Sequence, residues 1–283
     1  MVMDLAVELI HATVQLEQPL GDGTRTVGTG FLISAPGPDG KPRTVLVTAH
    51  HVFEKMQLAE ARIGYRISNP DGSWSYSPKP IKIRDKDAAQ LWTNHPTRDV
   101  AVMTIKAPPE FAKAAIPVDY LAKDDTFDAY QVNAGNEMMA LGFPRGLSAN
   151  SAGFPILRSG RVASYPLGPA AAFPTFLLDF SVFPGNSGGP VFITRQQNAT
   201  VLTPVSDKAP EQGFIAGLLT QQVELNAERL EIGIVTHAKY IRETIDLLGA
   251  PSLAPATVAE APPPAPTPVQ GATTASAEEA ARD

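Results

Sequence analysis

Short apolar runs separated by turn-forming residues dominate this chain and restrict its fold more than any other feature. The turns are rich in Gly, Pro, Asp and Asn, as in 21–23, 36–40 and 69–72, and these residues favour tight chain reversals. Long helical patterns do not alternate with the runs, so the pattern predicts an all-β sandwich or barrel instead of a parallel sheet. The predicted strands cover residues 10–16, 28–34, 44–48, 61–67, 100–105, 137–141, 175–180, 190–193, 213–220 and 230–236.

The end of the chain has a different character. Apolar residues at helical spacing run through 238–248, and Gly249 and Pro251 end the pattern, which predicts a closing helix. Residues 250–283 are rich in Pro, Ala and Thr and contain almost no large apolar side chain, so we expect a disordered tail. The sequence therefore predicts one folded domain over residues 1–249, followed by the tail.

The composition excludes several classes of function. The 283 residues carry a formal net charge of −6, whereas a general nucleic-acid binder needs a basic surface. The chain lacks cysteine, which removes disulfides, a thiolate nucleophile and cysteine-based metal sites. No apolar run is long enough for a membrane span, and no nucleotide, calcium or redox motif occurs, so we expect no cofactor and no metal.

The first residues do not indicate a compartment. Residues 1–16 include Asp4 and Glu8 and lack a basic segment followed by an apolar run, so they do not read as an export signal. A cytoplasmic protein and an exported or periplasmic protein whose signal has been removed both remain open.

Three segments have the residue types needed for nucleophilic catalysis. His51 follows an apolar strand, Asp99 opens another, and Ser187 lies in the turn Pro-Gly-Asn-Ser-Gly-Gly-Pro over 184–190. A serine hydroxyl becomes a good nucleophile when an imidazole accepts its proton, and a carboxylate holds that imidazole in the right tautomer. Glycines on both sides of Ser187 allow the N–H groups of Gly185 and Ser187 to converge on an oxyanion.

These motifs, T-A-x-H-V, D-V-A-V and G-N-S-G-G-P in the order His, Asp, Ser, resemble those of chymotrypsin-fold, trypsin-like serine peptidases, above all the bacterial HtrA/Deg-like branch. The resemblance covers most of residues 8–247. It implies a chymotrypsin-like double β-barrel, with six-stranded barrels at about 5–115 and 130–236 and a closing helix over 238–248. The 34 residues from 250 to 283 are too few for the PDZ domain that the Deg-type enzymes usually carry.

The resemblance also implies a role for each site residue. His51 would be the general base, Asp99 the acid that orients it and Ser187 the nucleophile, with Gly185 and Ser187 forming the oxyanion hole. Further positions are implied for a residue that supports the acid and for the primary substrate pocket. They are Thr220 for the acid, and Ser181, Leu219 and Val235 for the pocket.

The resemblance makes the expected function hydrolysis of peptide bonds in polypeptide substrates through an acyl-enzyme. Because Ser181 offers no carboxylate at the base of the pocket, we expect small or medium apolar side chains before the cut; a preference for Glu through His237 is the less favoured reading. Asn186 replaces the Asp that pairs with a new N-terminus in zymogen-activated members, so we expect no activation of that kind. The oligomeric state is left open.

Three alternatives bear on the site. Adjacent strand residues point to opposite faces, so only one of His50 and His51 can serve; the family motif places the catalytic histidine directly before Val52, which favours His51. The turn also fits the G-x-S-x-G elbow of α/β-hydrolases, but that fold needs the order Ser, acid, His, and only His237 follows Ser187. The third alternative is a catalytically silent binding or scaffold module with this fold.

Overall fold

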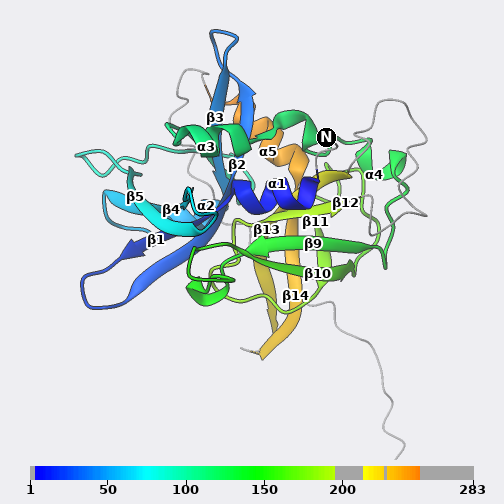
Figure 1. The fold of residues 1–283 in the computed structure, drawn as a ribbon. Helices are drawn as coiled ribbons and strands as arrows, with labels where there is room; N and C mark the ends of the chain where they lie inside the picture. Colours follow the sequence, from blue (N-terminus) through cyan, green and yellow to red (C-terminus); the bar gives the residue numbers. More distant parts are fainter. Residues whose placement is uncertain (1–3, 195–212, 226–227, 249–283) are drawn as a thin grey trace, which may run out of the picture.

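The computed structural model describes residues 4–194, 213–225 and 228–248 (Figure 1). The predicted tail over 250–283 lies outside these residues. The described residues form two β-sheets that share one continuous apolar core. None of their helices has the length and apolar character needed to cross a membrane.

The first half of the chain forms an eight-stranded sheet. Its strands run in the order β5-β4-β1-β2-β3-β7-β6, and β8 pairs in parallel with β2. The eight strands are β1 (Thr13–Pro19), β2 (Arg25–Pro36), β3 (Pro42–Thr48), β4 (Glu60–Ser68), β5 (Trp74–Lys82), β6 (Thr93–Asn94), β7 (Ala101–Ile105) and β8 (Ile116–Pro117).

The second half forms a closed six-stranded barrel in the order β10-β11-β14-β13-β12-β9. Neighbouring strands are antiparallel throughout this barrel. The six strands are β9 (Glu137–Gly142), β10 (Ile156–Val162), β11 (Thr175–Asp179), β12 (Pro190–Thr194), β13 (Gly213–Leu225) and β14 (Glu228–His237).

Helical segments are short and lie around and between the sheets (Figure 1). The last helix, α5, packs on β13 and β14 of the barrel and also on β7 of the first sheet, so it joins the two halves. The segments are α1 (Leu5–Ala12), α2 (His50–Glu54), α3 (Pro109–Ala114), η1 (Val118–Tyr120), α4 (Thr126–Ala129), η2 (Pro144–Gly146) and α5 (Ala238–Asp246).

The predicted fold class is confirmed: the structure is mostly β, with a closed barrel, a second sheet and a C-terminal helix. The first sheet differs from the six-stranded barrel that was expected. Its hydrogen bonds follow an open path of seven strands with β8 added at the side. The long β4–β5 hairpin extends one edge, and the two-residue strand β6 forms the other edge.

Two local predictions were wrong. Residues 10–16 were expected to be a strand. Residues 13–16 do belong to β1, but residues 10–12 belong to α1, because Leu5, Leu9 and Ala12 make a buried helical stripe and the Asp4 carboxylate accepts the N–H of Ala6. The second error concerns α2, which begins at His50, directly after β3. The two histidines therefore lie in a helical turn, so strand alternation does not decide between them.

Candidate active site

His51 and Asp99 are bound to each other through two hydrogen bonds. The main-chain N–H of His51 donates to Asp99 Oδ1 at 2.9 Å, and His51 Nδ1 lies 2.6 Å from Asp99 Oδ2. The first bond uses one of the free N–H groups in the first turn of α2. Asp99 lies just before β7, which pairs with β3, the strand that leads into α2. The sheet therefore brings the two residues together.

Asp99 is held in its charged form. Burial by itself would raise the pKa of Asp99, but the hydrogen bonds from His51 and the charge of its ring outweigh burial and lower the pKa below its usual range. The carboxylate is therefore ionised at neutral pH, where it can hold the His51 ring with its proton on Nδ1 and its other nitrogen free to accept.

His50 faces a different environment. Its Nδ1 accepts the indole N–H of Trp92 at 3.1 Å, and the two rings lie 6.0 Å apart. Of the two adjacent histidines, the structure thus brings His51, and not His50, to Asp99.

Ser187 lies in the turn between β11 and β12, on the barrel side of the site. Its hydroxyl donates to the main-chain carbonyl of Thr220 on β13 at 2.9 Å. Within the described parts of the chain, no hydrogen bond joins the Ser187 hydroxyl to the ring of His51. In this structure the Ser187 hydroxyl is therefore bonded to a backbone carbonyl. The side chain would have to change rotamer before the hydroxyl could turn away from that carbonyl.

Two glycines give the Ser187 turn its shape. Gly185 and Gly188 have φ angles of +96° and +91°, a region that favours glycine. A Cβ atom would lie 2.3 Å from the Phe143 carbonyl oxygen at Gly185, and 2.0 Å from the Thr29 carbonyl oxygen at Gly188. Larger residues would therefore displace the backbone that carries Ser187.

Two N–H groups of this turn are available to an anion. Among the described residues, no protein acceptor takes the N–H of Gly185 or of Ser187, whereas the N–H groups of Asn186, Gly188 and Gly189 are all bonded to carbonyls. Free neighbouring N–H donors are the groups that an oxyanion hole requires.

Thr29, on β2, joins the Ser187 turn to the first sheet. Its N–H donates to the Ser187 carbonyl at 2.9 Å, and its hydroxyl donates to the Gly185 carbonyl at 2.7 Å. The same hydroxyl accepts the N–H of Phe143 at 3.1 Å, and Thr48 Oγ1 donates to the Thr29 carbonyl at 2.7 Å. Thr29 is completely buried. Sequence reasoning overlooked it, although a polar residue between Gly28 and Gly30 was the available signal.

The side chain of Thr220 does not make the contact that the resemblance implied. Its Oγ1 donates to the Ile234 carbonyl at 3.2 Å, and no hydrogen bond to Asp99 occurs within the described ranges. The β13–β14 register shifts between Leu219 and Gln221, and such a bulge turns a side chain in a new direction. In this structure Thr220 contributes its carbonyl to the site, where it binds the Ser187 hydroxyl.

The expected pocket residues lie near the segment that precedes Ser187, with little exposed surface. Leu219 and Val235 are only 1% and 0% exposed. Ser181 is half-buried, and its carbonyl accepts Arg158 Nη1 at 2.6 Å. The Leu219 side chain lies beside Gly233, together with Phe180 and Val182. These three side chains are apolar, whereas the Arg158 guanidinium beside Ser181 brings a positive charge, 5.4 Å from the centre of the Phe180 ring.

Asn186 and His237 are both buried. Asn186 is 3% exposed, and its Nδ2 lacks a hydrogen-bond partner among the described residues. His237 lies against the rings of Phe127 and Phe176, whose centroids are 5.0 Å and 5.1 Å away. It lines a cavity of about 200 Å³ with Asp124, Leu167 and Lys239, so its surroundings do not include the expected pocket residues.

Comparisons with known proteins agree with this arrangement. Residues 28–200 match the family model described as the trypsin-like peptidase domain. No curated protein matches the sequence significantly. Among solved structures, a variant of the HtrA-type protease AlgW with a tripeptide is 17% identical, with a TM-score of 0.51, over 87% of this chain. The chain spans 62% of that structure's length. The protease Anisep from Arthrobacter nicotinovorans is 15% identical, with a TM-score of 0.50, over 86% of this chain and 98% of that one.

The fold and the site together define a trypsin-like peptidase domain. Because the family model matches more than half of the sequence, the chain belongs to the trypsin-like peptidase family. At these low identities the solved structures show the shared fold alone.

Proposed function

We propose that this chain is a serine endopeptidase, with His51 as general base, Asp99 as its orienting acid and Ser187 as nucleophile. The observation that carries the proposal is the double hydrogen bond between His51 and Asp99, opposite a glycine-rich turn that presents a serine and two free N–H groups. These are the groups that acyl transfer by a serine needs.

The proposed reaction begins when the Ser187 hydroxyl leaves the Thr220 carbonyl and turns to His51. His51 takes the hydroxyl proton as Oγ attacks the peptide carbonyl carbon, and the N–H groups of Gly185 and Ser187 stabilise the negative oxygen. The C–N bond then breaks, and His51 passes the proton to the leaving amine. A water molecule, deprotonated by His51, hydrolyses the acyl-enzyme and restores Ser187.

For the substrate, we propose small or medium apolar side chains before the cut. Ser181 offers no carboxylate to bind Arg or Lys, and the side chains of Phe180, Val182 and Leu219 supply apolar surface. The Arg158 guanidinium on the Ser181 carbonyl would repel a cationic side chain. A cleavage profile on a peptide library tests this: an enrichment of Val, Ala or Leu is expected, and a strict requirement for Arg or Lys would refute it.

A fluorophosphonate probe tests the proposed chemistry, because it reacts with an activated serine. We expect the wild-type protein and His50→Ala to be labelled, Ser187→Ala to remain unlabelled, and His51→Ala to react far more slowly. Activity that survives in His51→Ala but is lost in His50→Ala would show that the wrong histidine has been assigned.

The bond from the Ser187 hydroxyl to the Thr220 carbonyl favours a second candidate function, a catalytically silent binding module. A folded wild-type protein that stays unlabelled across a range of conditions would select this alternative and reject the peptidase.

A further inference from the structure

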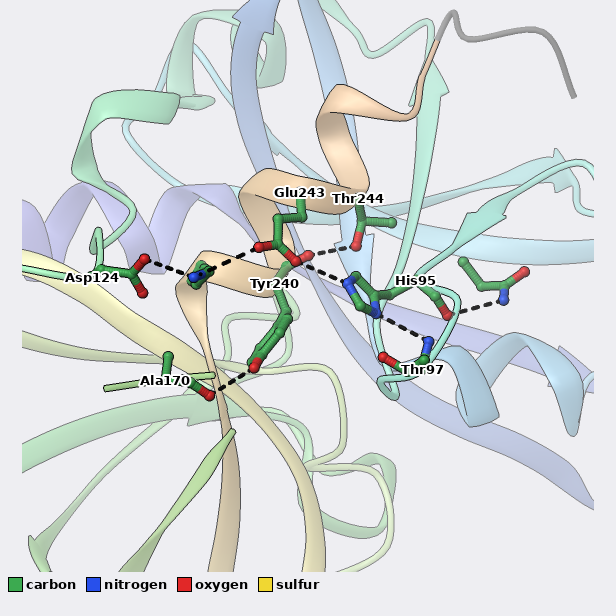
Figure 2. Close-up of polar contacts among 9 residues, drawn as sticks. His95, Thr97, Asp124, Ala170, Tyr240, Glu243 and Thr244 are labelled. Carbon is green, nitrogen blue, oxygen red and sulfur yellow. Dashed lines mark hydrogen bonds and ion pairs between the residues drawn. The ribbon is translucent and has the colours of Figure 1, made fainter. Parts of the chain in front are cut away.

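The segment that carries Asp99 is fastened to helix α5. His95, four residues before Asp99, is 8% exposed, and its Nε2 lies 3.1 Å from Glu243 Oε2 on α5 (Figure 2). His95 Nδ1 accepts the main-chain N–H of Thr97 at 3.2 Å. Because Nδ1 is the acceptor, the ring proton is on Nε2, which donates to Glu243. One imidazole thus links its own loop to α5.

Tyr240 strengthens the same junction. The His95 ring meets the Tyr240 ring edge to face, with centroids 5.2 Å apart, and the Arg98 guanidinium lies 5.2 Å from the centre of the Tyr240 ring. The Tyr240 hydroxyl donates to the Ala170 carbonyl at 2.7 Å (Figure 2). The loop before β7 therefore rests on a helix that is itself anchored to the barrel half of the molecule.

Asp99 depends on this loop for its position. Within the described residues, both hydrogen bonds to its carboxylate come from His51, and Thr220 binds elsewhere. His51 is the group that Asp99 must orient, so the carboxylate needs another source of rigidity. The main-chain N–H of His95 donates to the Val100 carbonyl at 2.9 Å and closes the loop around Asp99. His95 is therefore bonded both to this loop and to α5.

We propose that His95 is a positioning residue: by bonding to Glu243, it uses α5 to hold Asp99 in register with His51. The proposal rests on the serine peptidase function proposed above. Displacing a catalytic group by about 1 Å can reduce turnover about 100-fold, so a bond outside the reacting atoms can control the rate.

Two substitutions separate the functions of the His95 ring. In His95→Asn, the side-chain oxygen can replace Nδ1 as acceptor for Thr97, but nothing reaches Glu243. In His95→Gln, the longer amide can donate to Glu243 in place of Nε2. Glu243→Ala breaks the same bond from the partly exposed side of α5, where a loss of folding is not expected. The matched control is Arg242→Ala, which cuts the bonds of α5 to the carbonyls of Val118 and Leu121.

Steady-state kinetics are the first measurement. For His95→Asn and Glu243→Ala we expect kcat to fall about 10- to 100-fold, with KM changed less than about twofold, because the substrate contacts are intact. His95→Gln should recover most of kcat, and Arg242→Ala should keep it. The double variant His95→Asn/Glu243→Ala should be no slower than the slower single variant, because both remove one interaction.

Proton NMR provides a measurement independent of activity. A proton in a charge-assisted bond as short as the 2.6 Å His51–Asp99 contact resonates far downfield of the amides. This resonance should weaken or disappear in His95→Asn and Glu243→Ala, and persist in His95→Gln and Arg242→Ala. Thermal unfolding verifies that each variant is folded, and if His95→Asn is not, Glu243→Ala decides.

The outcomes distinguish the two proposals. If folded His95→Asn and Glu243→Ala keep the wild-type kcat and the downfield resonance, the positioning role is wrong while the peptidase function stands. If Arg242→Ala loses as much kcat as Glu243→Ala, the effect belongs to α5 docking in general and the specific role of His95 is refuted. A wild-type protein without activity or labelling refutes the proposed function, whereas the resonance still reports whether His95 positions Asp99.

Discussion

Burial of His237 predicts a specific loss of stability in mild acid. The side chain is 6% exposed and its Nε2 has no hydrogen-bond partner among the described residues. Burial lowers the pKa of His237 from its ordinary value of 6.5 to about 4, although the charge of Asp124 and the Leu167 carbonyl act in the opposite direction. The native protein therefore resists protonation at this site, whereas the unfolded chain accepts a proton below about pH 6.5.

The sign and size follow from this difference in pKa. Between the two values the unfolded state holds one more proton, so the free energy of unfolding falls by about 1.36 kcal/mol for each pH unit of acidification. The difference of about 2.5 between the two pKa values amounts to about 3 kcal/mol when the pH has dropped below both. About 2 kcal/mol of this should be lost between pH 7 and pH 5.

His237→Leu removes the titrating group and keeps an apolar side chain of similar size between Phe127 and Phe176. Urea unfolding at several pH values, in a Ser187→Ala background that prevents self-digestion, measures the effect. Relative to the parent, the variant should gain about 2 kcal/mol on going from pH 7 to pH 5. The control Phe31→Leu, which truncates a fully buried ring on β2 in the first sheet, should lower stability equally at each pH. Parallel curves for the parent and His237→Leu would refute the reasoning.

Three further substitutions have defined outcomes. Gly188→Ala places a Cβ atom 2.0 Å from the Thr29 carbonyl oxygen in a left-handed conformation; it should cost about 3 kcal/mol in thermal unfolding and abolish probe labelling, and a labelled, stable variant would contradict this. Arg66→Met removes a buried guanidinium that binds three carbonyls, including that of Gly153; urea unfolding should show a loss of about 3 kcal/mol, and a variant as stable as the parent would contradict this. Asp99→Asn should reduce kcat by about 10⁴-fold while the fold survives, and a kcat near that of the parent would remove Asp99 from the mechanism.

The sequence predicts the residue types of the site better than the contacts between them. The position of His51 before Val52, and that of Asp99 at the start of an apolar strand, identify the pair that the structure brings together. The bulge beside Thr220 could not be predicted from the sequence, because the shift in register depends on how β13 and β14 pair. A motif therefore identifies which residues lie near the site, and strand pairing decides which of their atoms point into it.

Contacts between distant segments have no local signal. His95 and Glu243 are 148 residues apart in the chain, and each taken alone reads as an ordinary polar residue. Arg66 likewise lies in a strand of mixed polar and apolar residues, and its partners are the carbonyls of Ile10 and His11 in α1 and of Gly153. Side chains that bond to backbone far away in sequence become visible only when the packing of the two sheets is known.

The bonds of Thr29 have a consequence for how the protein is made. Thr29 leaves the ribosome long before the turn it supports, since 156 residues separate it from Gly185. Until the barrel strands have been synthesised and have docked on β2, the carbonyls of Gly185 and Ser187 lack their partner, and long-range closures of this kind form late. The turn that carries Ser187 would therefore be incomplete while the chain is being synthesised. Other polypeptides would meet a complete site only after folding has ended.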